Sequence, residues 1–214
     1  MAVSLNLTEF SNLPALKLMA LDYPALQIID FKLPSFQVYE HGPGFLDKTT
    51  MVKYWLTYAF GHRDYFNTLY NNHHHTDEIR TSECVDFVSV DLLPKDLTKS
   101  TPVTTPRKDS AMSYEAIADE LTKAITNPMF APLMATDDSL AKLPQSYIMN
   151  AEFDVLRDEG YILAERLRQN GVPVEHKFWG TEEHGFLNFV EIDDIAMKET
   201  DDFAEYFLNV VNSV

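Results

Sequence analysis

The 214-residue sequence contains a single cysteine, Cys84, and few basic side chains. One cysteine cannot form an internal disulfide bond, although the count leaves the redox compartment open. Cys84 lies beside Glu83 and close to Asp86, and these acidic neighbours predict a raised thiol pKa that disfavours a role as nucleophile. Seventeen Lys and Arg against 33 Asp and Glu give a formal charge of −16. Binding to nucleic acid is not expected, because it requires clustered basic side chains, and attraction to anionic lipid surfaces is disfavoured as well.

Long apolar runs are also missing. No stretch approaches the ~20 apolar residues of a membrane-spanning helix. Met1 is followed by A-V-S-L-N-L-T, without the basic residues that open a signal peptide. The composition is that of a folded protein, because 45% hydrophobic and 12% aromatic residues exclude disorder as the general state. A chain of this length forms one large domain or part of a larger one.

Three short apolar runs predict buried β-strands, at 16–21, 145–152 and 173–179. A helix is expected between the second and third, from about 157 to 170, because apolar residues recur there at helical spacing and Gly171 follows. A last helix is expected from near Thr200. Strands that alternate with helices in this way predict a parallel α/β layer.

The stretch from 33 to 143 is too long for an ordinary connection between two parallel strands. Helical spacing predicts helices of its own at 49–60 and 113–126. Ten aromatic residues crowd its first half, between positions 36 and 70; most are expected in a core, and a few could line an apolar pocket. The sequence thus predicts a core formed by 1–32 and 144–214, with 33–143 inserted as a helical cap or lid.

Asp154 and His184 are the main candidates for chemistry. Each follows a predicted strand, and they are 30 residues apart. An acid and then a histidine, each on a loop leaving a strand, is the chain order of the last two members of an α/β-hydrolase Ser-Asp-His triad. In that role Asp154 would orient His184, which would act as general base and then general acid. The alternatives are a helix-capping carboxylate for Asp154, for which Asp158 competes, and an ordinary exposed loop histidine for His184.

The nucleophile that such a pair would activate is missing from the sequence. No serine here lies in the G-x-S-x-G pattern that places a hydrolase nucleophile on a sharp turn. Ser4 does not qualify, because it lacks glycine neighbours. The chain therefore carries an acid and a base without a recognisable serine for them to act on.

Three consecutive histidines, His73 to His75, precede Asp77 and Glu78 and raise the question of a zinc site. Adjacent residues in an extended chain point to opposite sides, so three in a row rarely converge on one ion. The useful helical spacing of i and i+4 is not filled by another histidine. A solvated loop is the better prediction, with no metal and no cofactor.

Beyond the acid and histidine, longer segments resemble a known family. The sequence closely resembles arylacetamide deacetylases and neutral cholesterol ester hydrolases, of the hormone-sensitive-lipase-like branch of the α/β-hydrolases, in A-L-Q-I-I-D-F-K-L-P-S-F-Q, M-V-K-Y-W-L-T-Y-A-F, F-D-V-L-R-D-E-G-Y and E-E-H-G-F. This resemblance implies an α/β-hydrolase fold and hydrolysis of apolar carboxylic esters or amides through a serine acyl-enzyme. It matches Asp154 to the catalytic acid and His184 to the catalytic base, and it implies no cofactor or metal.

The family's H-G-G-G and G-D-S-A-G-G motifs have no counterpart here, and residues 1–7 resemble the helix that follows the second motif. We therefore expect an incomplete fold, the C-terminal part of such an enzyme, from a truncated isoform, a partial gene model or a fragment, and inactive on its own. The resemblance also implies residence in the endoplasmic reticulum with a luminal catalytic domain, and membrane association only through an N-terminal anchor absent from this sequence. The alternatives are a non-catalytic binding protein of the same fold and an unstable truncated fragment.

Overall fold

The computed structural model describes residues 1–10, 13–99, 101 and 121–213. Its centre is a three-stranded sheet of order β1-β2-β3, formed by β1 (Met19–Asp22), β2 (Ser146–Phe153) and β3 (Val174–Glu183). Both neighbouring pairs are parallel, which confirms the predicted layer. β1 is shorter than the predicted run, and β3 continues to Glu183, four residues past its predicted end.

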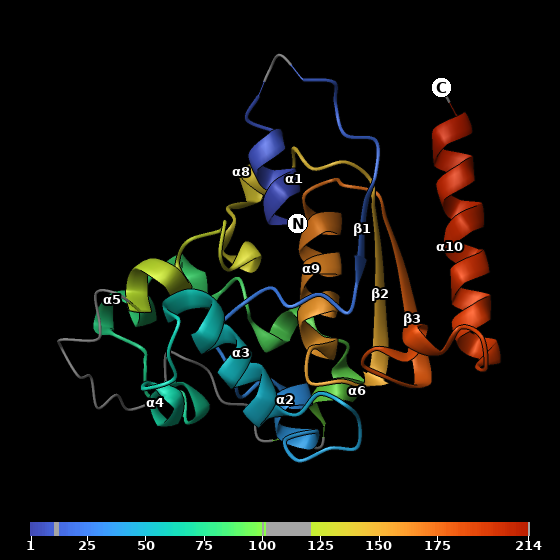
Figure 1. Cartoon of the computed structure of the whole chain (residues 1–214). Helices are drawn as coiled ribbons and strands as arrows, with labels where there is room; N and C mark the ends of the chain where they lie inside the picture. Colours follow the sequence, from blue (N-terminus) through green and yellow to red (C-terminus); the bar gives the residue numbers. More distant parts are fainter. Residues whose placement is uncertain (11–12, 100, 102–120, 214) are drawn as a thin grey trace.

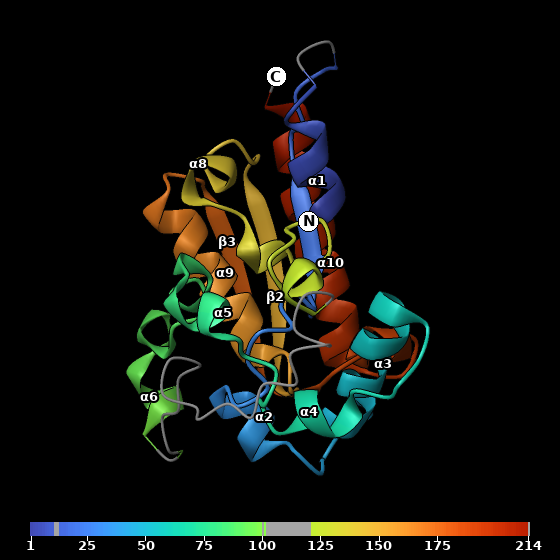
Figure 2. The same cartoon turned by 90° about the vertical axis from the view of Figure 1, so that its left-hand side faces the viewer.

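Helices cover both faces of the sheet (Figures 1 and 2). α1 (Ala2–Leu7) and α9 (Arg157–Gln169) lie on one face, and α10 (Asp194–Asn212) lies on the other. The central strand β2 shows why, because its buried side chains point alternately to the two faces. Tyr147 and Met149 pack in the cluster beneath α10, and Ile148 packs in the core that contains the apolar side of α9. Burial on both faces is typical of parallel strands.

The sequence located α9 well and α10 poorly. α9 ends within one residue of its predicted limit, and Gly171 follows with φ +76°. α10 begins at Asp194, six residues before Thr200, because the Asp193 side chain accepts hydrogen bonds from the backbone N–H groups of Ile195 and Ala196. Asp193 is thus the N-cap of α10, and Asp194 adds a negative charge in its first turn.

The described part of the segment between β1 and β2 is mostly helical and gathers around the carboxyl ends of the strands and beside α9 (Figure 1). Its elements are α2 (Pro34–Val38), α3 (Lys48–Phe60), α4 (Phe66–Tyr70), α5 (Asp77–Thr81), η1 (Glu83–Val85), η2 (Val90–Leu92), α6 (Lys95–Thr98), η3 (Pro132–Met134) and α8 (Asp137–Leu140). The predicted helix at 49–60 is confirmed as α3, which Asp47 caps through Thr50 N–H at 2.6 Å and Gly61 ends in a left-handed conformation.

The other helix predicted in this segment, 113–126, falls mainly outside the described residues, and 121–125 are helical. Buried side chains of the segment, such as Leu56 and Leu133, share one hydrophobic core with Ile148 of β2 and Leu163 of α9. The division into a core of 1–32 and 144–214 and a cap of 33–143 remains a prediction. None of the helices in the described ranges combines the length and apolar character needed to cross a membrane.

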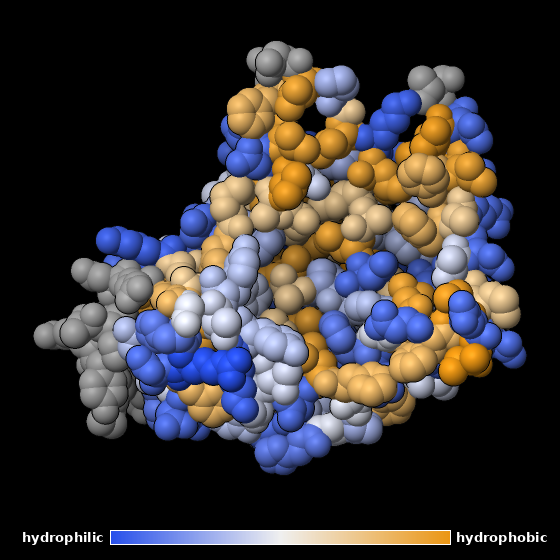
Figure 3. Space-filling view, viewed as in Figure 1, coloured by the Kyte–Doolittle hydropathy of each residue, from blue (hydrophilic) through white to orange (hydrophobic). Residues whose placement is uncertain are grey.

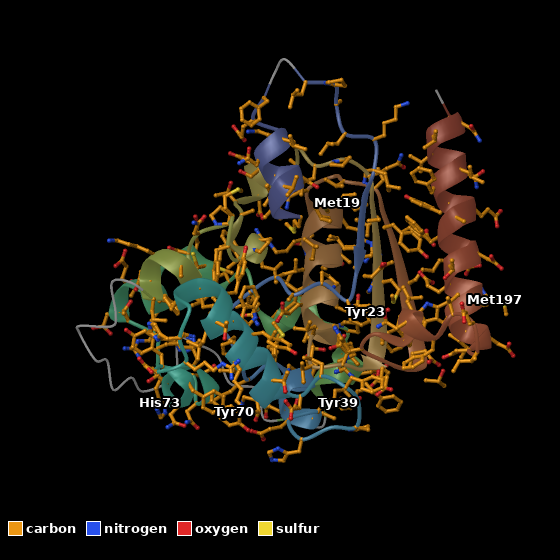
Figure 4. The ribbon with its side chains drawn as sticks, viewed as in Figure 1. Met19, Tyr23, Tyr39, Tyr70, His73 and Met197 are labelled. Carbon is orange, nitrogen blue, oxygen red and sulfur yellow. The ribbon has the colours of Figure 1, made fainter. Side chains whose placement is uncertain are left out.

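The expectation of a solvated histidine loop is wrong for two of its three members. His73 is exposed (Figure 4), but His74 and His75 are buried and lie with Nε2 against the carbonyl oxygens of Ile28 and Ile29, at 3.0 Å for His74. Burial is the main cause that lowers the pKa of His74 well below its usual range. A buried irregular segment needs donors for its carbonyl groups, and no periodicity in the sequence reveals which side chains supply them. Among the described residues, no three His, Cys, Asp or Glu side chains form a group that could hold a metal ion.

Candidate active site

Asp154 and His184 occupy equivalent places in the sheet. Asp154 is the first residue after β2, and His184 is the first residue after β3. Because the two strands are neighbours and parallel, their carboxyl ends meet at one edge of the sheet. The two loops therefore bring together Asp154 and His184, which lie 30 positions apart in the sequence.

The two side chains form a hydrogen bond. Nδ1 of His184 lies 2.9 Å from Oδ2 of Asp154, which confirms the expected contact. The Asp154 side chain is fully buried, whereas the His184 side chain is 28% exposed. Beside a carboxylate, Nδ1 carries the proton, which leaves Nε2 as the ring nitrogen that can exchange a proton with a reacting group.

Asp154 also has a structural role, although it does not cap a first-turn N–H group of α9. Its Oδ1 accepts a hydrogen bond from Leu156 N–H at 2.8 Å, in a turn that leads into α9. The N-cap position of α9, Leu156, has no side-chain cap of its own. This structural bond and the acid–base interpretation are compatible, because each uses a different oxygen of the same carboxylate. The bond to Leu156 fixes the plane of the carboxylate that faces His184.

The loop that carries His184 is held from β1. Tyr23, the residue directly after β1 (Figure 4), accepts a hydrogen bond from Leu187 N–H at 3.1 Å through its hydroxyl oxygen. Its ring centroid lies 4.9 Å from that of His184 and 5.9 Å from that of the buried Phe186. Burial, more than the nearby carboxylates, raises the pKa of Tyr23 to about 12. The sequence showed Tyr23 only as part of a strand end before Pro24, so its contact with the histidine loop was missed.

The first turn of α9 holds the chain that follows Tyr23. Glu159 accepts hydrogen bonds from the backbone N–H groups of Leu26, at 2.5 Å, and Gln27, at 3.2 Å. Asp158 accepts one from Ser35 N–H at 2.7 Å. Burial is the main cause that raises the pKa of Glu159 to about 8. Both carboxylates lie in the first turn of the helix, where their negative charge interacts favourably with the helix dipole. The sequence shows no sign of their backbone partners, which lie more than 120 positions away.

Arg157 fixes the start of α9 from the other side. Its guanidinium donates to Glu152 at 2.6 Å and to Asp158 at 3.0 Å, and the Tyr39 hydroxyl bonds to the same Glu152 carboxylate. Arg157 therefore joins the end of β2 to α9, on either side of Asp154. Charged groups at this depth are stable only because each has a partner.

A cleft of about 580 Å³ opens beside the end of β1, and most of the residues that line it are apolar. Asp22 and Pro24, the two neighbours of Tyr23, contribute to its wall. Trp55 and Tyr58 of α3 form an aromatic side with Phe130, whose ring stacks on Tyr58 with centroids 5.1 Å apart. Of the aromatic residues crowded between positions 36 and 70, Trp55 and Tyr58 line the cleft, and others, such as Phe36, belong to the core.

Cys84 does not complete the pair. It is half-buried, and the main cause of its raised thiol pKa is desolvation; Glu83 adds less, and Ser82 opposes the rise. The sequence therefore gave the right direction of the shift but not its principal cause. A thiol with a raised pKa is a poor nucleophile at neutral pH.

Comparisons with known proteins agree on one family for this chain. Residues 88–188 match a family model described as an alpha/beta hydrolase fold. The sequence is 36% identical over 179 residues to arylacetamide deacetylase of Bos taurus and 34% identical over 178 residues to neutral cholesterol ester hydrolase 1 of Mus musculus. These alignments cover 82% and 81% of this chain, and 42% of each relative, so the chain spans less than half of the relatives' length.

Solved structures agree on the fold. The chain is similar to fungal esterases of Rhizomucor miehei, with a TM-score of 0.61 and 20% identity over 98% of this chain and 47% of that one. An esterase of Pyrobaculum calidifontis gives a TM-score of 0.52 and 19% identity over 95% of this chain and 47% of that one. The parallel sheet, the matched family model and these relatives together show that the chain belongs to the α/β-hydrolase family, in the group that contains arylacetamide deacetylase and neutral cholesterol ester hydrolase.

Proposed function

We propose that this chain supplies the acid and the base of a serine-type hydrolase of carboxylic esters or amides. The observation that carries the proposal is the 2.9 Å contact between Asp154 and His184, at the carboxyl ends of neighbouring parallel strands. In this mechanism His184 removes the proton from a serine hydroxyl as it attacks the carbonyl carbon. It then returns the proton to the leaving group, and Asp154 stabilises the imidazolium formed between the two steps.

The serine of this mechanism is not provided by a G-x-S-x-G pattern within the 214 residues. Acyl transfer therefore depends on residues outside this sequence, and we expect the 214-residue chain alone to be inactive. Without a nucleophile and the preorganised amide donors of an oxyanion hole, neither attack nor charge stabilisation is available.

The cleft beside β1 supports an apolar substrate. Trp55, Tyr58 and Phe130 present aromatic faces there, and apolar pockets with a few polar groups are typical of small-molecule sites. We propose that segment 33–143 acts as a cap that completes this pocket. Residence in the endoplasmic reticulum, which the resemblance implies, remains a prediction.

A second candidate is a non-catalytic binding protein, favoured by the missing nucleophile pattern. A fluorophosphonate probe separates the two, because it reacts only with an activated serine. We expect no labelling of the 214-residue chain and strong labelling of the longest polypeptide that its gene encodes in frame. If that longer polypeptide is folded and is not labelled, the binding function is favoured and the hydrolase proposal fails.

A further inference from the structure

We propose that Tyr23 is a positioning residue that holds the His184 loop in the geometry of the acid–base pair. The inference rests on the proposed function for its meaning, but its structural content can be tested without hydrolysis. Within the described residues Tyr23 forms no hydrogen bond with Asp154; it acts through the loop that carries the base.

The backbone at Tyr23 is tied to the sheet. Its N–H donates to the carbonyl oxygen of Met149 at 2.9 Å, which extends the β1–β2 ladder by one residue. Its φ is +37°, in the left-handed region that non-glycine residues rarely adopt. Such a conformation is strained and persists only where the surroundings fix it. Tyr23 is therefore a fixed point from which the loop after β3 can be held.

The loop after β3 needs such a point. Gly185 follows His184 with φ +83°, in the same left-handed region, which glycine enters at little cost and which gives the chain freedom to turn. The short helix η4 (Phe186–Phe189) comes next and has no side-chain cap. Backbone N–H groups in the first turn of a helix have no partner within it, and the Tyr23 hydroxyl accepts one of them, from Leu187.

The ring of Tyr23 adds a second contact. Its centroid lies 4.9 Å from the imidazole of His184, with the two planes inclined by 50°, and 5.9 Å from the ring of Phe186 in an edge-to-face arrangement. The hydroxyl thus holds the backbone of the loop, and the ring limits the rotation of the histidine side chain. A histidine that must contact both an acid and a nucleophile depends on this kind of orientation.

The hydroxyl stays protonated over the whole physiological range, because burial raises the pKa of Tyr23 to about 12. The acceptor for Leu187 N–H is therefore a neutral oxygen. The rival interpretation is that Tyr23 only packs in the apolar cluster beneath α10, to which it also belongs. In that case the hydroxyl would be dispensable, and Tyr23→Phe would leave the histidine loop unchanged. The two interpretations differ in a measurable way.

The test uses the complete 214-residue chain and NMR. Two signals are followed: the exchange rate of the Leu187 amide with water, and the downfield Nδ1–H proton of His184 that its bond to Asp154 protects. In Tyr23→Phe we expect about tenfold faster Leu187 exchange and a broadened Nδ1–H signal, because the acceptor is lost and the ring stays. In Tyr23→Leu, which also removes the ring, we expect the Nδ1–H signal to disappear.

Tyr206→Phe is the matched control, because Tyr206 lies in the same cluster on α10 and contacts the Tyr147 ring; it should change neither signal. Amides in β2 report whether each variant is folded. The inference is overturned if Tyr23→Phe leaves both signals as in the wild type, or if the wild type shows no protected Nδ1–H proton. Absence of fluorophosphonate labelling in the longer gene product, with the NMR result as expected, would remove the hydrolase function and leave the role of Tyr23 intact.

Discussion

Asp154 connects two structural tasks in one side chain: one carboxylate oxygen turns the chain into α9, and the other faces His184. In Asp154→Ala, Leu156 N–H and His184 Nδ1–H both lose their acceptor; Leu156 is buried, whereas His184 is partly exposed. We expect the free energy of unfolding to fall by ~1–3 kcal/mol. Urea denaturation of the purified chain measures the change.

Asp154→Asn separates the two tasks. The amide oxygen can still accept from Leu156, so the fold should lose much less stability than with alanine. The amide cannot stabilise an imidazolium as a carboxylate does, so any activity of the longer gene product should still be lost. If the alanine variant were as stable as the wild type, the turn described at Asp154 would not contribute to stability.

His176 gives the protein a pH dependence. It lies on β3 with Nε2 2.9 Å from Oδ1 of Asn150, and burial lowers its pKa to about 4, with a smaller contribution from Arg168. The unfolded chain, with a histidine pKa of about 6.5, binds more protons between these two values. Stability from this group is therefore complete above pH ~6.5 and is lost as pH falls toward about 4, by up to ~1.4 kcal/mol per pH unit.

His176→Gln should flatten this part of the stability profile, as measured by urea midpoints between pH 7 and pH 5. His41→Gln is the control, because His41 is exposed and lies outside the core. The buried His74 also has a lowered pKa, and its contribution to the pH dependence of stability has the same sign in all three proteins. This contribution therefore cancels when their slopes are compared. Equal slopes for the wild type and His176→Gln would contradict the account of a buried neutral histidine.

At this scale chain order was the signal for the candidate acid and base, whose catalytic role remains a proposal. Asp154 and His184 were identified because each follows an apolar run, and the order of the pair is typical of a triad. Tyr23 and Glu159 were not identified, because their partners lie more than 130 positions away and are backbone N–H groups. A backbone group has no signature in the sequence.

Between elements, α9 approaches β2 closely at Gly160. Gly160 lies on the face of α9 that packs against Asn150, and a Cβ atom there would lie 2.2 Å from both terminal atoms of the asparagine amide. Asn150 cannot move freely, because it is buried and bonds to His176 and to the carbonyl oxygen of Arg157. Gly160→Ala, which gains ~1 kcal/mol in an exposed helix, should here cost ~1–3 kcal/mol.

A double-mutant cycle isolates this contact. In an Asn150→Ala background the obstacle is gone, so Gly160→Ala should become neutral or stabilising. Calorimetry or urea denaturation of the four proteins gives the coupling energy. If Gly160→Ala cost the same in both backgrounds, the approach of the two elements would not be the reason for the glycine.

The elements themselves were predictable where a local signal ends them. α3 and α9 were placed within one residue because Gly61 and Gly171 end each pattern. The start of α10 was misplaced because its cap, Asp193, is one of two adjacent acidic residues, and a capping carboxylate looks like any other in a sequence. The burial of residues 26–31 was not expected either, because the side chains that accept hydrogen bonds from their backbone N–H groups come from other parts of the chain.

At the scale of the molecule, the outer edge of β1 is open. Within the described residues, β1 pairs only with β2, and Figure 3, which looks onto its other edge, shows apolar side chains gathered between α1 and α10. Met19 and Tyr23 donate to the β2 side, at Gln145 and Met149. Successive N–H groups of a strand point to opposite sides, so the N–H of Ala20, which follows Met19, is directed to the open edge. We therefore expect the chain to associate through this edge as its concentration rises.

Ala20→Pro tests the association, because it removes an outward donor and leaves the β1–β2 bonds in place. Size-exclusion chromatography over a range of concentrations should show less association for this variant than for the wild type. Leu21→Pro is the contrasting variant; it removes a ladder bond and should destabilise the fold instead. A wild-type chain that stays monomeric, with slowly exchanging amides across 16–21, would contradict the account of an open edge.

The central claim, that Asp154 and His184 are the acid and base of an ester hydrolase, is tested most directly by kinetics. The rate of p-nitrophenyl ester hydrolysis should be measured for the longest polypeptide that the gene encodes in frame, as wild type and as His184→Ala. We expect hydrolysis by the wild type, and a loss of ~10³-fold or more in kcat with the variant still folded. Hydrolysis that persists undiminished in folded His184→Ala would contradict the claim.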